Sequence, residues 1–414
     1  MDGSRTLFLE KFDLFKIMSC ALLIGILFHE YIPLIVPLRY PIEQRALLTI
    51  VGMGFACYLI GHRVRNRLGV QFGHRQIAVE EPNALKQFTI AMLIFVPLLV
   101  FGASLFMTRG VPMFADTPEQ AAAIKTALNV RALGRTRAID VLLPFTALYC
   151  VGLCLRYPCR RHAMAIATMM CLCCLSLLFL KAGKGNIFKF LFGLVYLFDL
   201  NSDREIKLFS VRTICLMLLG AFVMVGAFHL SEGQDWIHSM LYVMDRFLVY
   251  SWEGLNYIVH GQLPPDIKPQ LLRFLSLGGP GASPDILLAR QMTHNPNASF
   301  GVIPTLFGFL YRNGGLTLVA LGFFALGFGV RELFIRMHTR RHDILAITTC
   351  YYLFLMLFTM FLVGDVFDEI RGLGLSVLVI YLMFRILESL RWKGLKTESI
   401  KPVNRKAAKP GGRI

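Results

Sequence analysis

The stretch SPDILLARQMTHNPNASFGVIPTLFGFLYRNGG (residues 283–315) closes the one long polar interval in a chain made otherwise of apolar runs. The interval begins at Leu230, and seven apolar runs come before it and three after it. Runs near the ~20 residues that an α-helix needs to cross a bilayer predict membrane-spanning helices. The stretch therefore separates two sets of predicted spans and fixes the organisation of the chain.

Composition supports the same interpretation. The chain has 414 residues, of which 56% are hydrophobic and 17% are charged, and a soluble core could not bury so much apolar surface. We therefore predict an all-α, polytopic integral membrane protein with about ten transmembrane helices. The first run continues into further spans and lacks a small-residue cleavage site, so it is not expected to be a signal peptide. The predicted spans are 17–35, 46–60, 88–107, 141–155, 163–180, 187–200, 213–228, 316–334, 344–363 and 373–387.

The net charge of +17 fits one orientation of these spans. With both termini in the cytoplasm, four basic clusters lie inside, as the positive-inside rule requires. Without the short sixth span the last two clusters would lie outside, so that span is kept. We therefore interpret the excess of basic residues as a determinant of membrane orientation that also contacts anionic lipid headgroups. Nucleic acid is not an expected partner. The clusters are HRVRNR (62–67), RYPCRRH (156–162), RMHTRRH (336–342) and KPVNRKAAKPGGR (401–413).

The predicted organisation has four parts. Residues 1–229 form a first transmembrane bundle of seven spans with an outer loop at 108–138, and residues 230–315 form a large outer loop with surface and re-entrant helices. Residues 316–390 hold the last three spans, and residues 391–414 are a basic cytoplasmic tail.

Two helices are expected inside the large outer loop. Residues 236–260 have helical periodicity but are too polar to span, so a helix at the membrane surface is predicted. Its polar stripe consists of Tyr242, Arg246, Tyr250 and Glu253. A second helix should start at the cap Ser283 and end before Pro296.

The end of the loop predicts a re-entrant segment. The chain should re-enter the membrane here, with Pro304 interrupting the re-entrant segment. Gly314–Gly315 should then allow a sharp turn into the eighth span. Arg290 and His294 are four residues apart in the preceding helix and so lie on one face if that helix reaches His294.

Basic residues gather at two earlier outer turns. Arg131, Arg135 and Arg137 run against the positive-inside trend, which favours a function, although a solvated loop edge also explains them. In LKAGKGNIF (180–188), Lys181 and Lys184 stand beside free N–H groups at a helix start, which is a good phosphate site. Interfacial anchoring by lysine is the alternative.

The last outer turn, GDVFDEIRG (364–372), is acidic. It places Asp365, Asp368, Glu369 and Arg371 between two apolar spans. These groups are able to hold a sugar hydroxyl or to act as a base, but a simple charged turn needs no such role.

The predicted spans are nearly free of charge, which counts against ion-coupled transport, because such coupling needs ionisable groups at mid-membrane depth. The charged groups collect instead on the outer face, next to lipid. This pattern suits a substrate with an anionic head on a lipid tail, such as a polyprenyl pyrophosphate, whose oxygens arginine grips in bidentate fashion.

The chain resembles the Wzy-type O-antigen polymerases, which join oligosaccharide repeat units. The resemblance lies in the layout of about ten spans with a large outer loop before the last three, in GVPMF (110–114), and in VIPTLFGFLYRNGG (302–315) followed by LGFFALGFG (321–329). It implies a GT-C-like, multi-pass glycosyltransferase of the bacterial inner membrane, with its active site facing the periplasm. Such an enzyme polymerises undecaprenyl-pyrophosphate-linked oligosaccharides without a metal or other cofactor and works with a chain-length regulator protein.

Residue roles follow from this resemblance. Arg290 lies eleven residues before Gly301, which resembles the R-x10-G spacing of outer loops in these polymerases, and the earlier outer loop holds no second copy. The candidate catalytic residues are His294 as the base, Arg290 on the pyrophosphate, and Asp285 or Glu253 as alternative bases. The candidate residues for binding pyrophosphate or sugar are Arg246, Arg131, Arg135, Arg137, Lys181, Lys184, Arg312, Tyr250, Asp365 and Arg371.

Three other functions fit parts of the pattern. An O-antigen ligase shares the loop layout and transfers finished polymer to lipid A-core. A lipid-linked oligosaccharide flippase should have internal repeats and charges inside the bundle, and neither is evident in the sequence. A membrane acyltransferase should have a histidine near the membrane interior, whereas His29 lies near the outer end of the first span.

Overall fold

A computed structural model gives the fold. It describes residues 10, 13–29, 41–71, 84–115, 120, 124, 138–157, 161–181, 184–201, 226, 236–237, 240, 250–261, 263, 265–267, 287–288, 290–291, 305–339, 343–364 and 366–389. Nearly all of these residues are helical, and none of them lies in a strand.

The described elements are helices throughout. They are α2 (Leu14–Leu27), α3 (Gln44–Gln71), α4 (Ala84–Arg109), η2 (Pro112–Phe114), η3 (Ala138–Leu142), α7 (Leu143–Arg156), α8 (Arg161–Leu180), α9 (Lys184–Asn201), α12 (Tyr250–Gly261), α15 (Thr305–Thr339), α16 (Ile344–Val363), α17 (Val366–Glu369), η4 (Ile370–Gly374) and α18 (Leu375–Ser389).

Within the described residues, seven helices are long and apolar enough to cross a membrane. They are α3, α4, η3 continued by α7, α8, α15, α16, and η4 continued by α18, and each coincides with one of the ten predicted spans. The chain is therefore an all-helical protein of the polytopic membrane type. Of the other three predicted spans, one overlaps the short α2, one is α9 with 18 residues, and 213–228 lies outside the described residues except for residue 226.

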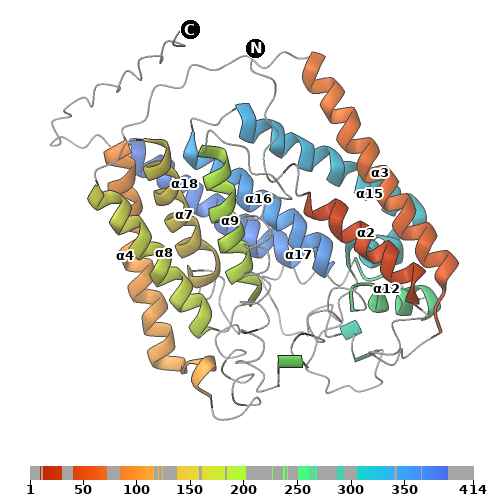
Figure 1. Ribbon diagram of the computed structural model, residues 1–414. Coiled ribbons are helices and arrows are strands. Elements are labelled where there is room, and N and C mark those ends of the chain that lie inside the picture. The colour runs from red at the N-terminus through yellow and green to blue at the C-terminus, as the bar shows by residue number, and fades with distance from the viewer. Residues whose placement is uncertain are drawn as a thin grey trace, which may run out of the picture.

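Helices α7 and α16 occupy the centre of the bundle. Helix α7 packs against α4, α8, α9 and α16, and twelve of its fourteen residues are buried. Figure 1 shows α4, α8, α9 and α18 around α7 on one side, and α2, α3, α12 and α15 on the other side of α16. Peripheral helices leave apolar side chains such as Val100, Met169 and Ile386 exposed, which is what surfaces that face lipid require.

Helix α15 is two helices joined by a reversal of the chain. The rings of Phe307 and Phe323 stack with their centres 4.1 Å apart, whereas sixteen residues of straight helix would separate them by about 24 Å. Gly314 and Gly315 leave the helical conformation between them, and Gly315 has φ 60° and ψ −155°, a region open in practice only to glycine. The sharp turn predicted at Gly314–Gly315 is confirmed.

Two glycines bring α3 and α15 into backbone contact. A Cβ added to Gly61 would lie 2.1 Å from the carbonyl oxygen of Phe324, and one added to Gly327 would lie 2.1 Å from that of Tyr58. Small residues allow this close approach where lipid-exposed helices gain little hydrophobic driving force from pairing. The crossing joins the second span to the first span after the polar interval.

We predict that Gly61→Ala and Gly327→Ala each destabilise the protein by about 1–3 kcal/mol, because the added methyl groups overpack the crossing. The measurement is the thermal unfolding midpoint of the protein in detergent. Gly52→Ala and Gly329→Ala are matched controls in the same two helices, since a Cβ at either position meets nothing within 4 Å. Equal midpoints for all four variants would contradict the close crossing.

Candidate functional site at the predicted outer end

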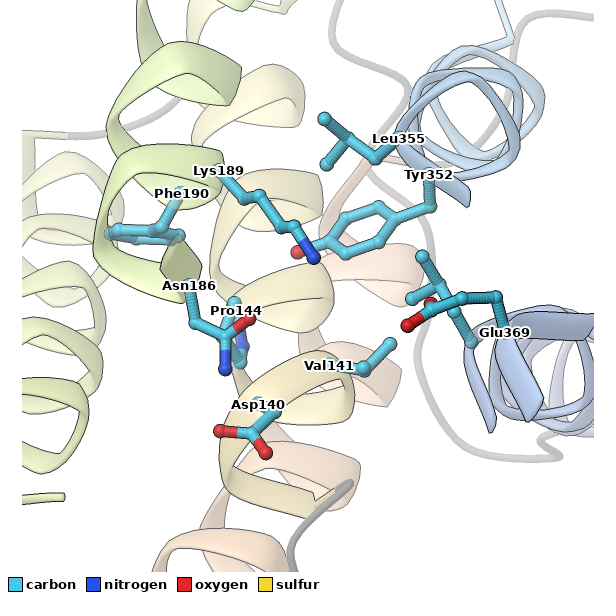
Figure 2. Close-up of a pocket in the computed structure, with 10 residues that line it drawn as sticks. Asp140, Val141, Pro144, Asn186, Lys189, Phe190, Tyr352, Leu355 and Glu369 are labelled. Carbon is cyan, nitrogen blue, oxygen red and sulfur yellow. The ribbon is translucent and has the colours of Figure 1, made fainter. Parts of the chain in front are cut away.

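A polar pocket lies at the end of the bundle that the sequence predicts to be the outer end. It has a volume of about 20 Å³, and its lining comes from η3, α7, α9, α16, α17 and η4. Figure 2 shows Asn186 and Lys189 entering from α9 and Glu369 from the opposite side, where α17 ends. The lining residues are Asp140, Val141, Pro144, Asn186, Lys189, Phe190, Tyr352, Leu355, Glu369 and Leu373.

Helix α9 supplies one wall of the pocket. Asn186, Lys189 and Phe190 follow the i, i+3, i+4 spacing that places side chains on one helical face. The hydroxyl group of Tyr351 donates a hydrogen bond of 2.5 Å to the backbone carbonyl of Lys189, which fixes α9 against α16. The polar face of α9 is thereby held over the start of α7.

Both carboxylates of the pocket lie in or next to a π-helical turn. Asp140 lies within the π-helical turn η3, and Glu369 directly precedes the π-helical turn η4, which also supplies Leu373. Single π-helical turns are frequent at functional sites, because the inserted residue redirects side chains from the regular helical positions.

Asp140 and Lys181 form a buried ion pair beside this pocket. The ammonium of Lys181 donates to Oδ2 of Asp140 over 2.5 Å, and the two side chains are only 10% and 8% exposed. Within the described part of the chain, Oδ1 of Asp140 is buried and accepts no hydrogen bond. Leaving such an atom without a donor costs about 1–3 kcal/mol, so an unsatisfied acceptor lies buried beside the pocket.

A second polar group caps the re-entrant half of α15. The guanidinium of Arg312 donates to Oδ2 of Asp266 over 2.9 Å, and the amide of Asn313 donates to Oδ1 over 2.9 Å. The side-chain oxygen of Asn313 accepts in return from the backbone N–H groups of Asp266 and Ile267. The chain at 265–267 is thus tied to the tip of the hairpin, with a half-buried arginine at its edge.

An aromatic contact links the pocket to the hydrogen-bonded cluster of Asp266, Arg312 and Asn313. Phe309, on the re-entrant half of α15, meets Phe367 of α17 edge-to-face, with ring centres 6.3 Å apart. Since Glu369 follows Phe367 by two residues, the re-entrant helix supports the wall of the pocket from behind.

The polar interval packs onto this end of the bundle through α12. Trp252 is fully buried, and the amide of Asn256 donates to the carbonyl of Pro41 and accepts from the N–H of Glu43, which holds the start of α3. Ile258 packs with Leu288 and with Tyr311 of α15. Arg290, two residues after Leu288, is therefore placed near the re-entrant helix, as a half-buried residue in a helical stretch.

The remaining predicted site residues divide into two groups. In the described part, Lys184 is the first residue of α9, Tyr250 is the first residue of α12, Glu253 is half-buried on α12, and Arg371 is half-buried in η4. The structure thus brings the turn at 180–188 and the turn at 364–372 together at one pocket, through Asn186 and Glu369. It also pairs Lys181 with Asp140. The other predicted residues lie outside the described residues, namely His294, Asp285, Arg246, Arg131, Arg135, Arg137 and Asp365.

Sequence reasoning missed Asp140, Asn186 and Lys189 as site residues. Asp140 is the last residue before an apolar span, and Asn186 and Lys189 are spaced three apart at the start of another. That spacing was a usable signal, because two polar residues on one face of a short apolar helix predict a polar partner surface.

Several charged groups at the opposite end of the bundle pair with one another among the described residues. Glu332 pairs with Arg65 and Arg336, and Glu10 pairs with Arg331 and His338. Burial alone would raise the pKa of Glu10, but hydrogen bonds and charge from His338 and Arg331 outweigh it and lower the pKa below its usual value. That end therefore has the character of an ion-pair network, in which Arg65 and Glu332 fix α3 to α15.

Comparisons with known proteins identify no relative. No protein-family model, curated protein or solved structure matches this chain.

The buried ion pair yields a prediction on stability. Lys181→Met leaves the Asp140 carboxylate buried and unpaired, and we expect it to cost about 3–5 kcal/mol of folding stability. The double variant Asp140→Leu/Lys181→Met removes both charges, and we expect it to recover most of the loss, because apolar replacement of a buried pair is often neutral.

Thermal unfolding in detergent measures both variants against the parent protein. Arg336→Met is the control, because its ion pair with Glu332 is 58% exposed on the arginine side. A single variant as stable as the control, or a double variant less stable than the single one, would show that the pair is not a coupled buried unit.

Proposed function

We propose that this chain is an integral membrane glycosyltransferase that polymerises undecaprenyl-pyrophosphate-linked oligosaccharide repeat units into O-antigen or a related surface polysaccharide. The reaction takes place on the periplasmic face of the bacterial inner membrane, with both termini in the cytoplasm. The resemblance of the sequence to the Wzy-type polymerases names the reaction and the GT-C-like architecture. The structure supports the proposal through the character of the site at the predicted outer end.

The observation that carries the proposal is the convergence of polar groups at one end of an apolar bundle. Asp140 of η3, Asn186 and Lys189 of α9, and Glu369 of α17 line one pocket although these three elements are far apart in the sequence. Arg312 stands at the tip of the neighbouring hairpin, and Leu288, two residues before Arg290, packs in one cluster with Tyr311, the neighbour of Arg312. A polar site at the end of an apolar helical bundle suits a substrate whose sugar is polar and whose carrier is a polyprenyl tail.

The transfer divides into two tasks. Arginine side chains bind the pyrophosphate oxygens and stabilise the negative charge that develops as the bond from the anomeric carbon to the phosphate oxygen breaks. A hydroxyl of the next lipid-linked unit forms the new bond to that carbon and gives its proton to a base, and undecaprenyl pyrophosphate leaves. Arg290 and Arg312 are the described candidates for the first task. His294 remains the proposed base, with Glu253 and Asp285 as alternatives.

Deleting the gene in its host tests the function directly. We predict lipopolysaccharide that carries a single repeat unit on its core, with the ladder of longer chains absent on a gel, and restored by the plasmid-borne gene. Bare core with polymer left on the lipid carrier would indicate a ligase instead. Bare core with single lipid-linked units held on the inner face would indicate a flippase, and an unchanged ladder would exclude O-antigen as the product.

Arg290 tests the pyrophosphate-binding role. We expect Arg290→Ala to reduce polymer by at least about 100-fold, because removing one charge-stabilising group in a transition state typically costs this much. The readout is the lipopolysaccharide ladder at matched amounts of protein in the membrane fraction.

Arg336→Ala is the matched control, since this arginine pairs with Glu332 at the opposite end of the bundle. Normal chain lengths in Arg290→Ala would remove Arg290 from the site. Loss of the ladder in both variants would attribute the effect to folding.

A further inference from the structure

An exposed apolar face marks the start of the helix that the sequence predicts over 236–260. Trp236, Ile237 and Met240 are helical, and their side chains are 43%, 71% and 53% exposed. Successive residues of an α-helix are turned by about 100°, so these three side chains share one face. An aromatic and two aliphatic groups thus point outwards together within the polar interval of the chain.

The indole of Trp236 lies against the end of the predicted seventh span. A Cβ added to Gly226 would lie 3.4 Å from Cη2 of this indole, and Gly226 is close to the end of the span predicted over 213–228. The contact places Trp236 at the level where that span is predicted to leave the membrane. Tryptophan is enriched at this level, because its ring is apolar while its N–H group needs a polar partner.

The two ends of the predicted helix have opposite surroundings. At its far end, in α12, Trp252 is fully buried in the bundle. Helical periodicity puts the predicted polar stripe, which includes Tyr250 and Glu253, on a different side from the exposed face at 236, 237 and 240. A helix with this separation of apolar and polar sides lies in the membrane interface with its apolar face in lipid.

We infer that Trp236, Ile237 and Met240 form a membrane anchor, which holds the start of the polar interval in the outer leaflet at the boundary between headgroups and acyl chains. Lipid suits this face because all three side chains are apolar and lie beside the end of a predicted span. Trp252 then fixes the polar interval to the protein, and Trp236 fixes it to the membrane. Such an anchor goes beyond the proposed function and serves any reaction at the neighbouring site.

Fluorescence quenching by brominated lipids tests the anchor on the full-length protein. The chain has three tryptophans, and subtracting the emission of Trp236→Phe from that of the parent isolates the signal of Trp236. The protein is reconstituted in phosphatidylcholine vesicles whose acyl chains carry bromine either near the headgroup or near the chain end. We expect shallow bromine to reduce the Trp236 emission at least about twofold and deep bromine to reduce it less, because an interfacial helix lies only about 5–10 Å into the boundary.

Trp252 provides the control for this measurement. The same subtraction with Trp252→Phe isolates an indole that is fully buried within the protein, and we expect shallow and deep bromine to leave its emission nearly unchanged. The Trp236 signal is obtained with Trp252 in place, so it remains interpretable even if the control variant does not fold.

The double variant Ile237→Ser/Met240→Ser keeps Trp236 and removes the rest of the anchor. We expect its emission to shift to longer wavelength and to become more sensitive to iodide in the aqueous phase, because less apolar surface holds the helix in lipid. Ile267→Ser is the matched control and should leave the emission unchanged. Ile267 is 43% exposed in the same interval, but its backbone N–H donates to Asn313 at the hairpin of α15.

Four results would overturn the inference. Quenching of Trp236 by iodide but by neither brominated lipid would place the exposed face in water. Quenching that is strongest near the chain end would place it in the membrane interior. Insensitivity to all three quenchers would show that protein covers the face, such as a second copy of the chain. An unchanged emission in the double variant would show that Ile237 and Met240 do not hold the helix in lipid.

Discussion

A carboxylate at the end of an apolar bundle must be paired or hydrated, and the ion pair of Asp140 with Lys181 meets this constraint. The pair joins the π-helical turn before α7 to the end of α8, and α7 is the helix on which α4, α8, α9 and α16 pack. Asp140 also lines the pocket, so the contact that anchors the bundle lies at the edge of the candidate site. Structural support and a polar site thus depend on one side chain.

The reversal at Gly314–Gly315 is the second constraint on the fold. It returns the chain along itself so that Phe307 stacks on Phe323, and Gly61 and Gly327 then let α3 and α15 touch through their backbones. This arrangement brings the end of the polar interval back to the bundle, where Phe309 meets Phe367 beside the pocket. The polar interval and the first bundle therefore contribute to the same end of the molecule.

Local features of the fold could be predicted from sequence, while the pocket could not. Seven predicted spans and the glycine turn depend on hydrophobic length and backbone freedom, which short windows of sequence contain. The pocket depends on packing between Asp140, Asn186 and Glu369, which are separated by tens to hundreds of residues. The two turns near 181–186 and 364–372 were recognised as polar, but nothing in either turn shows that the other lies opposite. Lys181 illustrates the limit: its sequence context suggests a phosphate ligand, and its partner in the fold is a carboxylate.

Reconstitution of the purified protein in proteoliposomes with a defined undecaprenyl-pyrophosphate-linked oligosaccharide tests the central claim most directly. Mass spectrometry of the products reports both bond formation and the leaving group. The account predicts chains of two or more repeat units on one carrier, with one undecaprenyl pyrophosphate released for each new linkage. Repeat units that remain single, or that cross the bilayer without forming a bond, would contradict it.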